Sequence, residues 1–131
     1  MKFEELNLND STLLDFRIER GGREPDLVIF TLDYIESYRT QKYKRIKLIF
    51  ERCFKFNASV NLNMSSPDSI AEGVEVLNSQ MLRMVHDSFS KIDSIDTSEL
   101  KHYQITMASS ASIFDIVCQS FCMLEADEGR K

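Results

Sequence analysis

A long alternating stretch constrains this chain more than any other part of its sequence. From Tyr43 to Met64, nearly every second residue is apolar, and the residues between them are mostly polar. The apolar positions are Ile46, Leu48, Phe50, Phe54, Phe56, Ala58, Val60, Leu62 and Met64. A period of two residues predicts β-strand with one face buried and the other in water. The rest of the chain must therefore supply a cover for that apolar face.

The same stretch is much longer than an ordinary strand of about five to six residues. Its alternation lapses at Arg52, so we expect an interruption over residues 51–53. Two interpretations stay open, because either a bulge bends a single strand or a tight turn separates two strands. The polar segment at residues 65–68 ends the run, since Pro67 lacks the amide hydrogen that a central strand must donate.

Further apolar segments predict the remaining strands. Alternating residues occur at 14–18, 28–34, 72–77 and 103–107, and a glycine-containing link makes the first two a hairpin. Residues 113–124 are apolar in both phases of the alternation, which is typical of a central strand covered on two sides.

One change of period predicts a helix. The apolar residues with helical spacing are Leu77, Met81, Leu82, Val85, Phe89 and Ile92. Asn78 or Ser79 is suited to cap the first turn, so we expect an amphipathic helix over residues 78–92 that covers the apolar face of the sheet. The predicted fold is α+β: a bent, mainly antiparallel sheet of six or seven strands with this one helix packed on it.

Length and charge limit the function classes. The 131 residues fit a single domain, which we expect to span residues 1–131 with a charged tail at 125–131. No apolar run reaches about 18 residues, and the N-terminus lacks the apolar core of a signal peptide. We therefore expect a cytoplasmic protein that does not cross a membrane. The formal net charge of −5 argues against nucleic acid as a partner, because such binding requires cationic surface.

Cysteine and histidine provide the first candidate site. Cys53, Cys118, Cys122 and His102 are the residue types that bind zinc. The chain has neither a CxxC nor an HxxxH pair, and zinc sites usually draw two ligands from such short spacings. We therefore interpret the cysteines as reduced structural thiols and predict neither a metal nor another cofactor.

A histidine beside an aspartate is the candidate for acid–base chemistry. His86 and Asp87 are adjacent in the predicted helix, and a carboxylate can orient an imidazole as a general base. No glycine-framed serine and no positioned cysteine identifies a nucleophile. We expect a solvated helix face there, and we predict that the chain has no catalytic residue and is not an enzyme.

Charged residues gather in several places. The basic group comprises Arg39, Lys42, Lys44, Arg45, Lys47, Arg52 and Lys55. We interpret them as exposed strand residues that discourage edge-to-edge pairing, and we favour this over a patch that binds phosphate or an acidic partner.

The acidic residues form three groups: Glu72 with Glu75, Asp93 with Asp96 and Glu99, and Glu125 with Asp127 and Glu128. None has the order of a calcium loop, so we favour solvated loops over an acidic face that docks a basic protein.

Four motifs in this order resemble a known group of proteins. Residues 9–14 read Asn-Asp-Ser-Thr-Leu-Leu, and residues 45–51 read Arg-Ile-Lys-Leu-Ile-Phe-Glu. The chain closes on Tyr-Gln-Ile-Thr-Met at 103–107 and Phe-Asp-Ile-Val-Cys at 114–118. This arrangement resembles small bacterial β-rich domains, some of which are assigned as immunity proteins of toxin systems. Asn9 stands where many of those domains have histidine.

The resemblance implies binding to a protein partner rather than catalysis. We therefore expect a non-catalytic protein-interaction domain, with an immunity protein that binds and neutralises a toxin as its specific form. The alternative is a small-ligand-binding domain whose apolar cavity lies between the sheet and the helix.

Overall fold

The computed structural model describes residues 1–37, 39–40, 42–62, 68–92 and 94–126. A short 3-10 helix, η1 (Phe3–Leu6), precedes the strands β1 (Thr12–Glu19), β2 (Leu27–Ser37), β3 (Lys42–Ser59) and β4 (Ile70–Glu75). The helix α1 (Gln80–Phe89) is followed by β5 (Lys101–Met107) and β6 (Ile113–Glu125). The described strands form one antiparallel sheet of six strands in the order β1-β2-β3-β6-β5-β4, so the predicted α+β class is confirmed.

The long alternating stretch forms one strand, and its interruption is a bulge. Arg52 has a φ of 55°, and the pairing of β3 with β6 shifts register between Cys53 and Lys55. The strand ends at Ser59, so the prediction that it continues through Val60 and Leu62 is wrong, and Met64 lies outside the described residues.

The bulge also changes which side chains face the core. Ile46, Leu48 and Phe50 are buried as predicted, and Phe56 packs against the same core. Phe54 instead joins a second apolar cluster with the helix, while Ala58 is exposed. The prediction of a single apolar face along the whole stretch is therefore wrong at Phe54. Cys53 packs against the core, Phe54 lies on the outer face, and the extra residue in β3 between Cys53 and Lys55 returns Phe56 to the core side.

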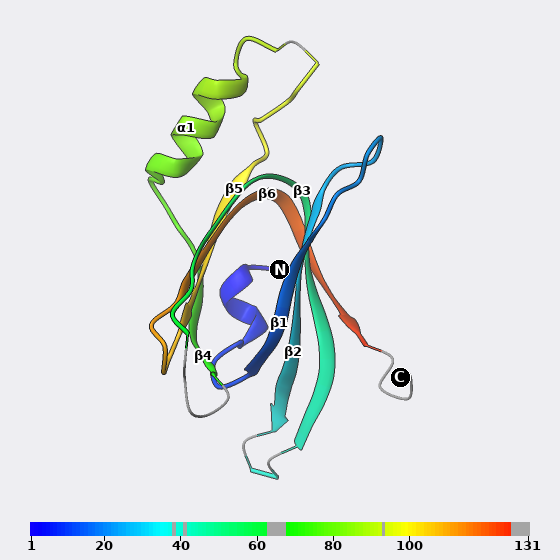
Figure 1. Ribbon diagram of the computed structural model, residues 1–131, viewed down its shortest axis with the longest axis vertical. Coiled ribbons are helices and arrows are strands. Elements are labelled where there is room, and N and C mark those ends of the chain that lie inside the picture. Colours follow the sequence, from blue (N-terminus) through cyan, green and yellow to red (C-terminus); the bar gives the residue numbers. More distant parts are fainter. Residues whose placement is uncertain (38, 41, 63–67, 93, 127–131) are drawn as a thin grey trace.

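The sheet arches over η1 and brings its two edges together at one end (Figure 1). Thr12 of β1 forms an isolated antiparallel bridge with Ser69, just before β4. The amide of Ile70 donates to the carbonyl of Ser11 over 2.8 Å, and Asp10 donates back to Ile70 over 2.8 Å. The segment that leads into β1 therefore shares backbone hydrogen bonds with the start of β4, although β1 and β4 are at opposite ends of the sheet order.

The main core lies inside this arch. Its largest fully buried side chains are Phe3, Phe30, Phe50, Phe114, Leu32, Ile46, Leu48, Ile70, Ile105, Met107, Ile116 and Val28. Phe3 belongs to η1, so the N-terminal segment supplies a cover that sequence reasoning assigned to the helix. Tyr34 fixes that segment by donating its hydroxyl hydrogen to the carbonyl of Leu6 over 2.7 Å.

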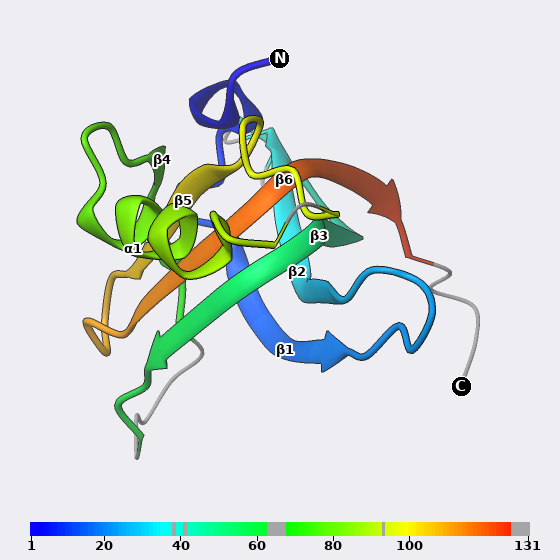
Figure 2. The same ribbon diagram turned by 90° about the horizontal axis from the view of Figure 1, so that it is seen from above.

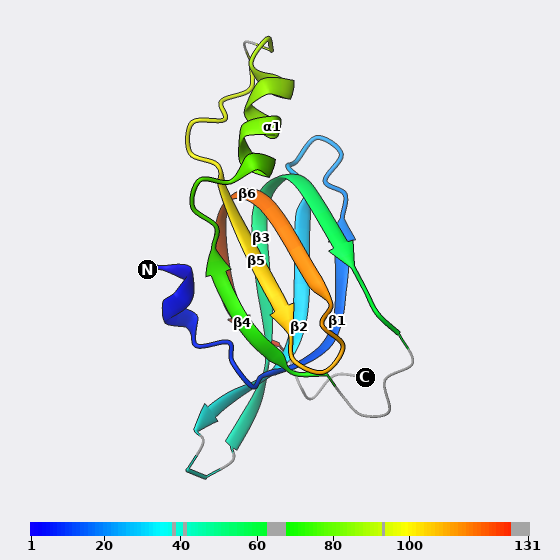
Figure 3. The ribbon, with the colours of Figure 1, turned by 90° about the vertical axis from the view of Figure 1, so that its left-hand side faces the viewer.

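The helix α1 is shorter than the predicted 78–92 and lies outside the arch (Figure 3). Ser79 caps it, as predicted, by accepting a hydrogen bond from the Leu82 amide over 2.9 Å. Val85 packs with Leu100 and Val117 in the second apolar cluster, which also contains Phe54. The prediction that this helix covers the principal apolar face is wrong, because it covers only a small area on the outer side of the sheet.

Candidate protein-interaction surface

Two strand edges remain unpaired and face the same opening. Within the described residues, β1 pairs with β2 on one side, and its other edge is joined to the sheet only near Thr12 and Leu13. Beyond Glu51, β3 separates from β2 and pairs with β6 alone, apart from one hydrogen bond from the Cys53 amide to the Asp26 carbonyl. Figure 2 shows the end of β3 running away from β2. Unpaired edges of this kind are templates for another extended segment.

Aromatic rings close the middle of this opening. Phe16 of β1 and Phe56 of β3 are in edge-to-face contact, with ring centroids 5.8 Å apart. A hollow of about 250 Å³ on one side is lined in part by Leu14, Phe16, Val60, Leu62, Met107 and Phe114. A hollow of about 180 Å³ on the other side is lined in part by Ile18, Val28, Cys53, Phe54, Lys55 and Phe56. The opening therefore has an apolar floor with a depression on each side of the rings.

Large apolar side chains at the rim are exposed. The exposed fractions are 43% for Leu14, 53% for Ile18, 40% for Val60 and 76% for Leu62. We call these four residues, together with Phe16, the gap surface. Single exposed apolar residues are ordinary, whereas several beside one another typically mark an interaction site.

The opposite edge of the sheet is covered. The Glu4 carboxylate of η1 accepts a hydrogen bond from the Glu75 amide of β4 over 2.8 Å. This hydrogen bond lowers the pKa of Glu4 below its ordinary value of 4.5. A Cβ at Gly73 would lie only 3.0 Å from Leu8 Cδ1 and 3.1 Å from Phe3 Cε2, so glycine permits this close packing. The edge of β4 is thus protected by η1, whereas no described segment pairs with the edge of β1 beyond Leu13.

A third hollow, of about 470 Å³, lies where β6 extends past the start of β5. Its apolar lining includes Met1, Leu6, Tyr103, Phe121 and Met123. The Tyr103 and Phe121 rings are in edge-to-face contact at 5.3 Å, and burial raises the pKa of Tyr103. This hollow is larger than either depression of the gap surface.

The four residues considered as zinc ligands do not converge. Cys53 and Cys118 are opposite each other in the β3–β6 pair, while Cys122 is opposite Ile49. His102 binds other side chains on the outer face of the sheet. Across the described part of the chain, no group of three or more histidine, cysteine, aspartate or glutamate residues is arranged to hold a metal ion.

A serine, a histidine and an aspartate form a hydrogen-bonded chain that sequence reasoning missed. His102 Nδ1 is 2.6 Å from Ser79 Oγ, and His102 Nε2 is 2.7 Å from Asp115 Oδ1. Ser79 and His102 are 5% and 6% exposed, and Ser79 Oγ already accepts from the Leu82 amide. A nucleophile must reach its substrate, so this buried chain is suited to fixing the start of α1 on the sheet. The three residues are far apart in sequence, and no local pattern connects them.

The hydrogen-bond partner of the His86 ring is a threonine and not the neighbouring Asp87, which was the candidate for orienting this imidazole as a general base. His86 Nδ1 is 2.7 Å from Thr97 Oγ1, in the loop that follows α1. Asp87 is exposed, and its backbone carbonyl accepts from the Ser90 hydroxyl. The contact between His86 and Thr97 therefore ties the loop to the helix.

Several members of the basic group are neutralised on the β2–β3 hairpin. Lys42 and Lys44 lie 3.9 and 3.5 Å from the Glu36 carboxylate, and Arg45 lies 2.8 Å from Asp33. Ion pairs of this kind are typical of exposed charged residues on a strand and do not indicate a phosphate site.

The acidic groups lie on several different elements. Glu72 and Glu75 lie on β4, and Glu125 ends β6. Asp96 and Glu99 lie in the loop before β5, whereas Asp93, Asp127 and Glu128 lie outside the described residues.

Comparison of the chain with protein-family models, with curated proteins and with solved structures found no match. In the described residues, no helix is long and apolar enough to cross a bilayer.

Proposed function

We propose that this chain is a non-catalytic protein-interaction domain and that it binds its partner through the gap surface. The observation that carries the proposal is the coincidence of two unpaired strand edges with four exposed apolar side chains. An extended partner segment can add to a free edge through backbone hydrogen bonds and place alternate side chains in hollows beside it. The two depressions beside Phe16 and Phe56 supply such hollows.

The charge of the chain indicates the chemistry of the partner. The net charge is −5, and Asp15 and Asp68 line the larger depression of the gap surface. A partner segment with apolar residues at its centre and a basic residue at the end that reaches Asp15 and Asp68 therefore complements this surface. The smaller depression is lined by charges of both signs, Arg20, Asp26 and Lys55, and favours neither sign in the partner.

An immunity protein that neutralises a toxin is the specific form of this proposal. The motif resemblance supports it, and so does the negative charge, because a toxin that acts on nucleic acid presents basic surface. The proposal places the chain in the cytosol, which is consistent with three cysteines that are all free thiols.

Binding to a toxin domain encoded beside this chain tests the proposal. We expect calorimetry to detect a complex, and Leu14→Asp and Leu62→Asp each to weaken it by roughly 30-fold, because each change places a carboxylate against an apolar side chain of the partner. Leu77→Asp is the matched control, since Leu77 is 76% exposed, as Leu62 is, and lies between β4 and α1, where it lines neither depression. If no neighbouring toxin binds, or if all three variants bind like the parent protein, the proposal is wrong.

The alternative function, binding of a small ligand, is supported by the hollow beside Tyr103 and not by the predicted cavity between the sheet and the helix. Between the sheet and α1, the hollow lined in part by Phe54, Met84 and Phe89 has only about 150 Å³, and the Phe54 and Phe89 rings are 5.1 Å apart. The hollow beside Tyr103 has about 470 Å³, within the range of about 300–1,000 Å³ typical of ligand pockets. Native mass spectrometry of the protein purified from its source organism tests this alternative. A retained small molecule that Phe121→Ala loses would support it, and a mass equal to that of the chain alone would count against it.

A further inference from the structure

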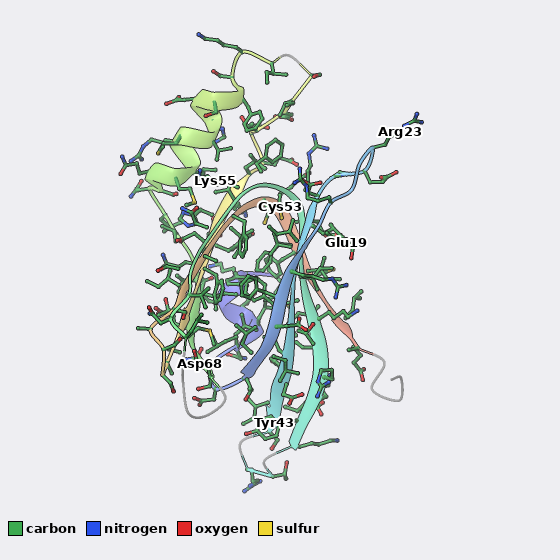
Figure 4. The ribbon with its side chains drawn as sticks, in the orientation of Figure 1. Glu19, Arg23, Tyr43, Cys53, Lys55 and Asp68 are labelled. Carbon is green, nitrogen blue, oxygen red and sulfur yellow. The ribbon has the colours of Figure 1, made fainter. Side chains whose placement is uncertain are left out.

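Two of the three cysteines are opposite each other in the centre of the sheet. Cys53 of β3 and Cys118 of β6 are direct partners in the antiparallel register, and both contribute to the main core. Figure 4 shows Cys53 beneath the crest where β3 and β6 arch over the core. We propose that Cys53 and Cys118 form a disulfide when a small peroxide enters the smaller depression of the gap surface. The pair is then a site of oxidative modification.

The register places the two residues at a suitable separation. Directly opposite residues in an antiparallel pair have Cα atoms about 4.5–5.5 Å apart, and disulfides join Cα atoms about 4.4–6.8 Å apart. The two thiols are also neighbours, since the interaction with Cys53 is the first cause of the raised pKa of Cys118. The bond can therefore form with little movement of the strands.

The two cysteines differ in access to the solvent. Cys53 is half-buried and lines the smaller depression of the gap surface, about 180 Å³ in volume, together with Ile18 and Phe56. Cys118 is fully buried behind it. A small oxidant therefore reaches Cys53 first. The interaction with Cys53, together with burial, raises the pKa of Cys118, so its attack on oxidised Cys53 is expected to be the slower step.

The reaction balances with hydrogen peroxide as the oxidant. The Cys53 sulfur attacks one peroxide oxygen, an S–O bond forms, the O–O bond breaks, and one water leaves. The Cys118 sulfur then attacks the sulfur of the resulting Cys53 sulfenic acid. An S–S bond forms, the S–O bond breaks, and the leaving hydroxide takes the Cys118 proton to form a second water. Two thiols are oxidised and one peroxide is reduced.

Cys122 provides an internal control. It lies between two residues that pack against the main core, Phe121 and Met123, and it is opposite Ile49. Alternation therefore places its side chain on the outer face, away from the other two cysteines. The native fold permits the Cys53–Cys118 pair alone, whereas the unfolded chain permits all three pairings of its cysteines.

Alkylation and mass spectrometry test this inference on the full chain. We expect the reduced protein to bind three maleimides when denatured, and the peroxide-treated protein to bind one, because two of its three thiols are lost. Peptide mapping should place the link between Cys53 and Cys118, and Cys122→Ser should leave its yield unchanged. The same oxidation in urea should produce all three links, which shows that the fold selects the pair.

Single variants complete the design. Cys53→Ser should retain two reactive thiols after peroxide treatment, and circular dichroism of this variant shows whether it is folded. If it is unfolded, the mapping of the parent protein and of Cys122→Ser still decides the question. The inference is overturned if the native protein keeps three thiols, stops at sulfinic acid on Cys53, or links Cys122 as often as Cys118.

Discussion

The Phe16 ring on β1 lies 4.9 Å, centroid to centroid, from the Phe114 ring on β6, although β2 and β3 lie between these strands in the sheet. Phe16 is also 5.9 Å from Phe30 and 5.8 Å from Phe56, so one half-buried residue joins the two sides of the arch. It is at once the floor of the proposed binding surface and part of the core.

Replacing this ring should weaken the fold more than its position on an edge strand suggests. A fully buried phenylalanine loses about 3–5 kcal/mol when it is truncated to alanine, and Phe16 is half-buried, so we expect Phe16→Ala to cost about 2–3 kcal/mol. The control Ile18→Ala removes a side chain that is 53% exposed and should cost less than about 1 kcal/mol. Urea denaturation measures both, and equal losses would show that Phe16 does not join the two sides.

Removing the Ser79 hydroxyl should loosen α1 from the sheet. Ser79→Ala deletes the helix cap and leaves His102 Nδ1 without this partner, so we expect a loss of about 2 kcal/mol. Ser88→Ala makes the same chemical change at an exposed position in α1 and should be nearly neutral. Hydrogen exchange of the α1 amides, combined with urea denaturation, distinguishes local release of the helix from global weakening. Identical behaviour of the two variants would refute this role of Ser79.

The covered edge of β4 should make stability depend on pH. The folded pKa of Glu4 is lowered, so its contribution is fully present above its unfolded value near 4.5 and is lost as the pH falls through the folded pKa. The unfolding free energy of the parent protein should therefore exceed that of Glu4→Gln at pH 7, and the difference should shrink below pH 4.5. Glu72→Gln, on β4, is the control for general loss of charge. A difference that does not change with pH would contradict the assignment.

Adding a methyl group at Gly73 should push η1 away from the sheet. The new Cβ would lie 3.0 Å from Leu8 Cδ1, so we expect Gly73→Ala to cost about 1–3 kcal/mol through overpacking. In combination with Leu8→Ala, which removes the nearest atom, the loss should be smaller than the sum of the two single losses. If the two single losses of unfolding free energy, measured by urea denaturation, add up to the loss of the double variant, then the new Cβ at position 73 does not press against Leu8.

The sequence predicts most of the secondary structure because alternation is a local property. Val28 and Phe30 or Tyr103 and Ile105 identify their strands without knowledge of their neighbours. Phe54 could not be placed in this way, because an apolar residue suits either face and only the backbone at Arg52 shows that the phase changes.

The candidate surface could be predicted even less well from the sequence. Leu14 and Leu62 are apolar in the sequence, but their neighbourhood depends on which edges of the sheet remain unpaired. Likewise, Ser79, His102 and Asp115 meet only because α1 begins above the β5–β6 pair.

The order of strands also has a consequence during synthesis on the ribosome. β3 and β6 are adjacent in the middle of the sheet, although more than fifty residues separate Ser59 from Ile113 in the sequence. The β1–β2–β3 meander therefore leaves the exit tunnel long before its central partner exists, and translation adds only about 5–20 residues per second. During those seconds Phe50 and Phe56 have no β6 to pack against, so the nascent chain is most vulnerable to aggregation before its last strand emerges.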